Sequence, residues 1–339
     1  MQHRSFIIAA GLCMLLLTGC SAPPKTESTD LFAMDTYMTL KVTAPDAEGL
    51  LQQASDRIKG LEDTFSVTRP DSDISKVNAA NGAPVTVQPD TMNVLQKAMQ
   101  IGEVSGGALD ITLYPVLKAW GFTTQDNHVP TPAELDALLP NVDYTQVQLS
   151  GNTVQIPADA QIDLGALAKG YTSDAVMDVF REGGAQSAII SLGGNVQAIG
   201  SRPDGTPWQV AVVDPFAPSE NLCILAVEDS AVITSGNYER YFTDEDGNTW
   251  WHILDPATGY PADNGLVSVT VVGTEGLYCD ALSTALFVEG TEQAKVHWQK
   301  AQDFEMLLVT SDGTILLTEG LEDCFTNLSS MPVEVIPRA

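Results

Sequence analysis

Two oxygen-bearing side chains, Asp280 and Thr284, lie four residues apart in the stretch CDALSTALFVEG. The surrounding pattern is helical, so both side chains project from one face of the helix. A carboxylate and a hydroxyl are hard oxygen ligands of the kind that Mg²⁺ prefers, with the other positions left to water or substrate phosphate. The alternative is structural: Asp280 complements a helix start, and Thr284 only packs.

A second candidate site is the stretch IDLGALAKGY, residues 162–171. Asp163, several small residues and Lys169 precede an apolar helical pattern. This order suits either a turn that holds phosphate or a tight connection from strand to helix. It does not match the nucleotide-binding pattern GxxxxGK[ST], because only two residues separate Gly165 from the Ala-Lys pair and no Ser or Thr follows the lysine. The residues alone leave both interpretations open.

A histidine could supply acid–base chemistry at one turn. His252 opens the stretch HILDPATGY, in which Asp255 and Pro256 favour a sharp turn. The imidazole could act as a general base or could be a polar residue at the edge of the turn. Two glycine turns, at 193–194 and at Gly236, allow close approach to a ligand, but every tight turn does the same.

Helices and strands must position these residues. Apolar residues recur at helical spacing over 50–61 and over 94–101, the second after Asp90 as candidate cap. Thr131 and Glu134 in TPAELDALLP have the order of a capping box. Strands are predicted at 153–156, 187–192, 208–213, 266–272 and 306–310. Hairpin tips are predicted at the pairs 150–151, 246–247 and 312–313.

These elements are mixed without regular alternation, and hairpins are frequent, which favours an α+β fold with mixed or antiparallel sheets and packed helices. We find no internal repeat, and no low-complexity linker after residue 30. A single compact domain is therefore expected.

The chain is strongly acidic, with 44 Asp and Glu against 16 Lys and Arg and a formal net charge of −28. Such a surface repels phosphate backbones, so nucleic-acid binding is not expected. Any site for an anionic ligand must overcome this field locally, with a metal cation, a lysine or helix N-termini.

The N-terminus indicates export. Residues 1–19 combine Arg4, an apolar run and small residues before Cys20, as in a secretory signal. The order Leu-Thr-Gly-Cys resembles a bacterial lipoprotein processing site. We therefore expect a signal peptide at 1–19, a lipidated Cys20 with a polar tether at 20–30, and a folded domain at 31–339. The lipid would anchor the protein to the cell membrane on its extracytoplasmic side.

Three further cysteines follow Cys20, at 223, 279 and 324. No CxxC pair and no close cluster of Cys and His occurs, so neither a structural zinc site nor a disulfide framework is indicated. We interpret the three as small buried apolar residues.

Taken together, the chemical segments resemble the FAD:protein FMN transferase family, the ApbE-like flavin transferases. The resemblance covers roughly residues 31–290 and rests on motifs that are ordered and widely spaced. These are AMDT, GALDITLYPVLKAWGF, IDLGALAKGY, SLGGN, TSGNYERYF, HILDPATG and DALSTALFV. Any one of them alone would be weak.

The resemblance implies a reaction. FAD binds with Mg²⁺ at its pyrophosphate, a threonine or serine hydroxyl of an acceptor flavoprotein attacks the FMN-side phosphorus, and AMP leaves. FMN then remains on the acceptor through a phosphoester. A metal that bridges the pyrophosphate oxygens would neutralise the departing charge. The acceptor implied is an exported or membrane-associated redox protein with a Thr/Ser-containing flavinylation motif.

The resemblance also implies roles for individual residues. Asp280 and Thr284 match the metal-binding pair, and the Ala166 carbonyl matches a third ligand. His252 is the candidate base for the incoming hydroxyl. The positions that match FAD-binding residues are Met34, Thr68, Ala108, Leu109, Asp110, Asp163, Lys169 and Ile253.

One position departs from the family pattern. Members often carry an aromatic residue where this chain has Thr68, and an aromatic ring there would stack near the flavin or the adenine. Without it, water could reach the pyrophosphate more easily. A metal-dependent FAD pyrophosphatase that gives FMN and AMP is therefore one alternative function. A non-catalytic flavin-binding lipoprotein is another.

Overall fold

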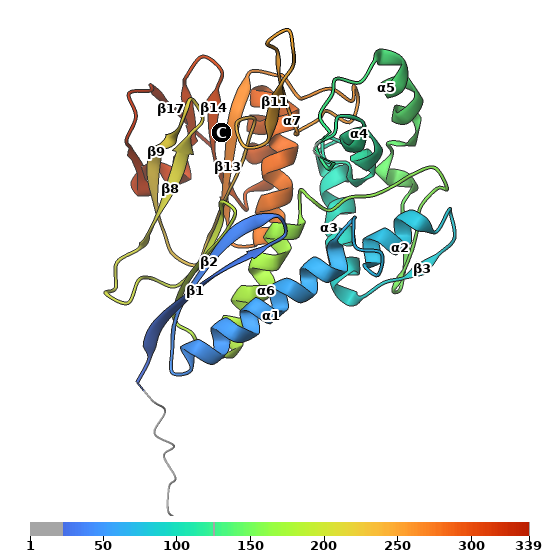
Figure 1. The fold of residues 1–339 in the computed structure, drawn as a ribbon. Coiled ribbons are helices and arrows are strands. Elements are labelled where there is room, and N and C mark those ends of the chain that lie inside the picture. The colour runs from blue at the N-terminus through green and yellow to red at the C-terminus, as the bar shows by residue number, and fades with distance from the viewer. Residues whose placement is uncertain (1–22, 125, 339) are drawn as a thin grey trace, which may run out of the picture.

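The computed structural model describes residues 23–124 and 126–338. The expected signal peptide at 1–19 and Cys20 lie outside these ranges. Within them, no helix has the length and apolar character needed to cross a bilayer. A large sheet occupies the middle of the molecule, with long helices on one of its faces (Figure 1).

The central sheet has nine strands, in the order β1-β2-β6-β7-β10-β13-β14-β15-β17. Its neighbours are antiparallel except β15 and β17, which are parallel. The strands are β1 (Lys25–Ala33), β2 (Thr36–Ala44), β6 (Ser187–Leu192), β7 (Asn195–Ile199), β10 (Ala231–Gly236), β13 (Leu266–Gly273), β14 (Glu305–Thr310), β15 (Ile315–Thr318) and β17 (Val333–Ile336). The expected α+β fold is confirmed.

Three long helices cover one face of this sheet: α1 (Ala47–Phe65), α6 (Ala168–Glu182) and α7 (Gly276–Ala301) (Figure 1). The apolar stripe predicted in α1 is buried, and Leu50, Ala54 and Ile58 pack with residues of α6 and of strands β2 and β6. Burial of one helical stripe against a sheet is the arrangement that a 3.6-residue apolar period favours. Helix α7 lies over β10 and β13.

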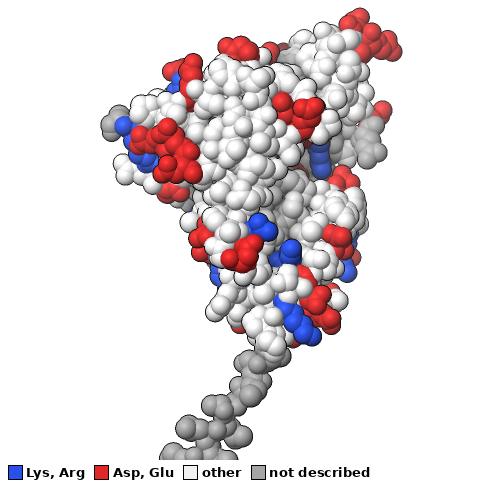
Figure 2. Space-filling model, turned by 90° about the vertical axis from the view of Figure 1, so that its left-hand side faces the viewer, with Lys and Arg blue, Asp and Glu red and all other residues white. Residues whose placement is uncertain are grey.

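A smaller sheet packs on the opposite face. It has the order β16-β9-β8 and consists of β8 (Trp208–Asp214), β9 (Ala217–Val227) and β16 (Phe325–Asn327). Val210 and Leu225 of this sheet share a core with Val267 and Leu307 of the central sheet. On the side seen in Figure 2, acidic and basic side chains gather near the margins around a largely uncharged middle.

Four further helices lie on the right of Figure 1, and the other strands and 3-10 turns are short. The helices are α2 (Asp73–Ala79), α3 (Pro89–Val104), α4 (Tyr114–Ala119) and α5 (Pro132–Leu138). The short strands are β3 (Val85–Thr86), β4 (Gln148–Ser150), β5 (Thr153–Gln155), β11 (Tyr241–Thr243) and β12 (Thr249–Trp251). The 3-10 turns are η1 (Ile111–Leu113), η2 (Leu139–Asn141), η3 (Tyr144–Gln146) and η4 (Glu319–Cys324).

An aromatic cluster joins two of the sequence motifs. Trp120, at the end of GALDITLYPVLKAWGF, is fully buried, and its indole N–H donates to the Gly259 carbonyl at 2.8 Å. The rings of Phe122, Trp250 and Tyr260 surround it. Aromatic pairs in tilted and edge-on arrangements fix relative position as well as burying area. The segments before residue 122 and after residue 250 are thereby held together.

The tether is shorter than expected. Residues 25–30, assigned to a tether from their polar composition, form most of β1 and pair with β2 from Lys25↔Ala44 onward. Glu27, Thr29 and Leu31 are less exposed than the residues between them. β1 is an edge strand, and an edge strand tolerates polar residues on its solvent side, so composition alone was misleading.

One of the two predicted helix caps is confirmed and the other is wrong. Thr131 and Glu134 form the predicted capping box. The cap predicted at Asp90 is wrong: α3 is preceded by Gln88 and has Pro89 in its first turn. The Asp90 carboxylate instead accepts both guanidinium N–H groups of Arg57 at 2.7 Å, which ties α3 to α1. The five predicted strands and the three predicted hairpin tips are confirmed.

Candidate active site

The starts of α6 and α7 cap each other. The first N–H groups of a helix lack partners within the helix, and neither helix has a side-chain cap at its own N-cap residue. Asp280 of α7 accepts the Gly170 N–H of α6 at 2.8 Å. Asp174 of α6 accepts the N–H groups of Gly276 and Leu277 in α7, at 2.7 and 2.8 Å. Each helix therefore supplies the acidic cap of the other.

Glycine makes this crossing possible. A Cβ atom on Gly170 would lie 2.4 Å from the Gly276 carbonyl oxygen and 2.5 Å from the Asp280 Cβ. Both distances are far below van der Waals contact, and both neighbours are held in a buried helix. Gly170 is thus required because the two helices approach too closely for a side chain. The small residues of IDLGALAKGY serve this packing as well as any ligand.

The structural role of Asp280 leaves one carboxylate oxygen for another partner. The side chain is buried, and burial raises its pKa, against the positive charge of Lys169. The buried Asn195 amide lies close enough to the Asp280 carboxylate to lower its pKa, although the amide nitrogen makes no hydrogen bond of normal geometry among the described residues. The carboxylate and the amide together offer polar atoms to a ligand.

The predicted metal ligands are compatible with a hard cation. Thr284 lies one turn after Asp280, with its hydroxyl 3.3 Å from that of Ser235. Ala166 precedes the Leu167 N-cap of α6, so its carbonyl is outside the helical ladder and accepts no hydrogen bond within the described residues. Those residues contain no cluster of three or more His, Cys, Asp or Glu that could hold a metal. The predicted set has one carboxylate, one hydroxyl and one carbonyl, which are the oxygen donors that Mg²⁺ takes together with phosphate.

Lys169 is the electrostatic centre of the site. Its charge acts on Asp163 and Asp280, and on His252 from a segment more than 80 residues away in sequence. Burial raises the pKa of Asp163, against the charges of Arg240 and Lys169. The structure therefore brings Asp163, Lys169, His252 and Asp280 into one region. Two cations in this region oppose the field of a chain with a net charge of −28.

His252 is held in a defined tautomer. Its Nδ1 lies 3.2 Å from the Arg240 carbonyl oxygen. A carbonyl can only accept, so Nδ1 carries the proton and Nε2 keeps a lone pair in the neutral ring. Burial lowers the pKa of His252 to about 4, and the charge of Arg240 acts in the same direction. The imidazole is therefore neutral at pH 7 and able to accept a proton at Nε2.

Glu239 and Arg240 were not predicted as site residues. They lie in the motif TSGNYERYF, whose sequence gave no reason to single them out. Protein atoms surround Glu239 closely enough to raise its pKa to about 7, although its side chain remains open to solvent. The charges of Lys169 and Asp280 both act on Glu239, which therefore lies near the two side chains.

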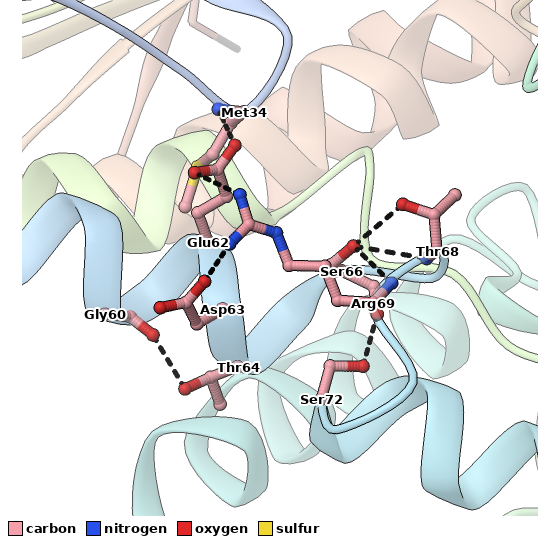
Figure 3. A network of polar contacts seen from close by, with 9 residues as sticks. All are labelled: Met34, Gly60, Glu62, Asp63, Thr64, Ser66, Thr68, Arg69 and Ser72. Carbon is pink, nitrogen blue, oxygen red and sulfur yellow. Dashed lines mark hydrogen bonds and ion pairs between the residues drawn. The ribbon is translucent and has the colours of Figure 1, made fainter.

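Met34 and Thr68 are linked through Glu62 (Figure 3). Met34 lies in the two-residue turn between β1 and β2, with φ of 50°, and its N–H donates to the Glu62 carboxylate at 2.9 Å. The second Glu62 oxygen pairs with Arg69 at 3.0 Å. Arg69 directly follows Thr68, which is exposed and donates its backbone N–H to the Ser66 hydroxyl at 3.1 Å. Glu62 thus connects the two loops that carry these predicted FAD contacts.

The remaining predicted contacts lie around η1. The Asp163 N–H donates to the Ile111 carbonyl at 2.9 Å, which fixes IDLGALAKGY beside the Ala108-Leu109-Asp110 stretch. The Asp110 carboxylate accepts the N–H groups of Thr112 and Tyr144, at 2.8 and 2.9 Å. Leu109 and Ile253 are buried, so any ligand contact with them would use backbone atoms.

A separate cavity of about 570 Å³ lies on the other side of α6, between α3 and the start of α7. It is lined by Gln96, Lys97, Asp178 and Glu275 among others, and by none of the predicted site residues. Lys97 and Glu275 pair across it at 2.9 Å. The candidate site is therefore defined by converging chemistry and does not coincide with this cavity.

Comparison with known proteins gives consistent matches. The sequence profile of the ApbE family matches residues 34–308. A FAD:protein FMN transferase of Klebsiella pneumoniae is 34% identical, with 88% of this chain and 93% of the relative covered. One of Vibrio cholerae is 31% identical, with 91% and 95% covered.

Solved structures agree. The ApbE protein of Thermotoga maritima superposes with a TM-score of 0.83 at 30% identity, covering 88% of this chain and 99% of that one. The apo form of the Pseudomonas stutzeri flavinyl transferase ApbE superposes with a TM-score of 0.80 at 28% identity, covering 89% and 97%.

Proposed function

Since the chain belongs to the ApbE family and is a flavin transferase that uses FAD, we propose that it transfers FMN to a Thr or Ser hydroxyl of an acceptor flavoprotein in a Mg²⁺-dependent reaction. AMP is the leaving group. The observation that carries the site assignment is the convergence of Asp163, Lys169, His252 and Asp280 at the start of α6. A helix N-terminus with a lysine beside it is a favourable place for a pyrophosphate.

The chain's own residues have distinct roles in this proposal. Lys169, at the start of α6, orients the pyrophosphate and offsets its negative charge. Asp280, Thr284 and the Ala166 carbonyl hold Mg²⁺, which would neutralise charge on the phosphate oxygens when bound. His252 Nε2 accepts the proton of the attacking hydroxyl as the new O–P bond forms and the bond to AMP breaks. The neutral ring described above suits this task.

FAD binding is assigned to both sides of the site. Met34 and Thr68 approach from the loops that Glu62 connects. The stretch Ala108-Leu109-Asp110, Asp163 and Ile253 approach from the opposite loops. Thr68 offers no ring for stacking and is exposed, so water has a route to the pyrophosphate. This observation favours FAD hydrolysis to FMN and AMP as a second activity.

We also assign this enzyme to the membrane surface. The lipoprotein-like N-terminus with Cys20 supports a lipid anchor on the extracytoplasmic side, and the acceptor is then an exported or membrane-associated redox protein. Comparison of detergent-phase partitioning of the full chain and of Cys20→Ser tests this. Equal partitioning of the two proteins would contradict the anchor.

Mass spectrometry tests the reaction. The full chain is incubated with FAD and the acceptor domain that the Vibrio cholerae relative flavinylates, with Mg²⁺ or with excess EDTA. We expect an FMN adduct on a Thr or Ser only with the metal. Free FMN and AMP without an adduct would identify the pyrophosphatase, and unchanged FAD with bound flavin would identify a binding protein. Formation of the adduct in EDTA would exclude metal dependence.

The variant Asp280→Asn separates the charge of Asp280 from its role as a cap of α6. Asparagine keeps an oxygen that can accept the Gly170 N–H but removes the negative charge, so α6 stays capped while a metal ligand is weakened. We expect transfer to fall by about 100-fold or more with little change in melting temperature. Asp280→Ala should lose both activity and stability, because the α6 N–H is then buried without a partner.

A further inference from the structure

Two large aromatic side chains stand exposed at the tip of the β1–β2 hairpin. Phe32 is 70% exposed and Tyr37 is 61% exposed. They are direct register partners on either side of the Met34-Asp35 turn, so their side chains lie next to each other on one face of the hairpin. The neighbouring residues Ala33 and Met38 point the other way, into the core. Phe32 and Tyr37 therefore form an uncovered patch on the outer face of the sheet.

This patch borders the candidate active site. The Asp35 carboxylate, in the turn between the two aromatic residues, lies 3.8 Å from the guanidinium of Arg240. The Arg240 carbonyl in turn accepts the backbone N–H of His252 at 3.1 Å and lies against its ring nitrogen. Tyr241, which follows Arg240, is 56% exposed. The turn between Phe32 and Tyr37 is thus linked through Arg240 to His252.

The reaction requires that a second protein contacts this edge of the site. Its second substrate is a protein, and a hydroxyl on a folded chain can reach His252 only if the neighbouring polypeptide lies on the rim of the site. Exposed aromatic residues are enriched among the side chains that dominate protein interfaces. Phe32 and Tyr37 match none of the predicted FAD contacts, and both are exposed on the hairpin face opposite the buried Ala33 and Met38.

A lipid bilayer is a less suitable partner for the aromatic patch than a protein. From Lys25 to Phe32, β1 advances seven residues, or about 24 Å at the usual rise of a strand. The hairpin tip is therefore far from the beginning of the described chain, which is the part nearest the expected anchor (Figure 1). Aromatic residues that dip into a bilayer beside a lipidated terminus would be expected close to that terminus.

We propose that Phe32, Tyr37 and Tyr241 form the docking surface for the acceptor protein, and bind the segment that flanks its Thr or Ser hydroxyl. This inference rests on the proposed transfer to a protein hydroxyl and adds where the acceptor binds. The segment that fits carries apolar side chains beside the hydroxyl residue, because the patch offers aromatic faces, with Asp30, Asp35 and Arg240 at its margin.

The test compares Phe32→Ser/Tyr37→Ser with Phe216→Ser. Phe216 is 51% exposed but lies between β8 and β9, on the smaller sheet, and so serves as a matched control. Rates of flavinylation are measured against the concentration of the acceptor domain that the Vibrio cholerae relative flavinylates. We expect the double variant to raise KM for the acceptor about tenfold, a loss of about 1.4 kcal/mol. KM for FAD, kcat and melting temperature should stay at wild-type values, as should all parameters of Phe216→Ser.

Other outcomes are distinguishable. A double variant with a wild-type KM for the acceptor would overturn the docking surface while leaving the transferase intact. If the double variant keeps the wild-type KM for the acceptor but is a monomer where the wild type is a dimer, the patch joins two copies of this chain. If the wild-type enzyme forms no adduct on the acceptor, the proposed function fails and the docking surface fails with it.

Discussion

Lys169 shows how one residue can organise a site. Its charge reaches Asp163, Glu239, His252 and Asp280, which come from four segments of the chain. With Arg240 it places two positive charges among these carboxyl groups, and two such charges favour the binding of a pyrophosphate in an acidic protein. The same two cations help to keep His252 neutral, so the groups that bind the anion also set the state of the candidate base.

His252 should make stability depend on pH in a particular direction. Its pKa is about 6.5 in the unfolded chain and about 4 in the folded protein, so the unfolded state binds a proton first as pH falls. The free energy of unfolding should therefore decrease from pH 6.5 to pH 4 and then level off for this residue. Chemical denaturation of the wild type and of His252→Asn measures it. A difference between the two proteins that is constant over this range would contradict the lowered pKa.

Glu62 should affect FAD binding although it is not predicted to touch FAD. Glu62→Ala removes the acceptor for the strained Met34 turn and the partner of Arg69, and we expect KM for FAD to rise several-fold. Glu62→Gln keeps an acceptor for the Met34 N–H and should have a smaller effect. Asp63→Asn, which alters only an exposed contact of Arg69, is the control. A lower melting temperature with unchanged KM would show that Glu62 is merely structural.

The sequence identified the residues that carry recognisable motifs and missed those that act through position. Asp163, Lys169, His252 and Asp280 were predicted and lie together. Glu239, Arg240 and Glu62 were not, because charged residues in turns and on exposed helical faces are common and have no distinguishing pattern. Their importance follows from distances that only the folded chain defines. The sequence allowed Asp280 to complement the start of its own helix, but it did not indicate that Asp280 caps α6.

At the scale of elements, the close crossing of α6 and α7 is the critical contact. Gly170→Ala places a methyl group against the Gly276 carbonyl and forces the helices apart. We expect a loss of stability of about 1–3 kcal/mol, as for other overpacked cores, and a larger loss of transfer activity because the caps at Asp280 and Asp174 are disturbed. Thermal unfolding and flavinylation rates measure the two effects. Gly60→Ala in α1, which meets no neighbouring atom, should be neutral or stabilising.

The elements were predictable where one physical signal dominated. Runs of β-branched and apolar residues located β6, β8, β13 and β14, and the capping box located α5. β1 was missed because an edge strand can be polar, and the start of α3 was misplaced because Asp90 is used by Arg57. The order of strands in the large sheet joins residues that are far apart in sequence, and no local pattern encodes it.

At the scale of the whole molecule, the reciprocal caps span long stretches of chain. Gly170 and Asp280 are 110 residues apart, and Asp174 and Gly276 are 102 apart. If the two helix starts open only together, the amide hydrogens of Gly170, Gly276 and Leu277 should exchange with solvent at similar free energies of opening. Native-state hydrogen exchange measures them. Exchange of Gly170 at a much lower free energy than Leu277 would show that the helices open independently.

The reciprocal capping of α6 and α7 also affects the order in which parts of the enzyme fold. The residues of α6 precede those of α7 by about a hundred positions, so the start of α6 lacks its acidic partner until the later helix has folded against it. The start of α6, where we propose that the pyrophosphate binds, is then expected to be among the last parts of the molecule to form.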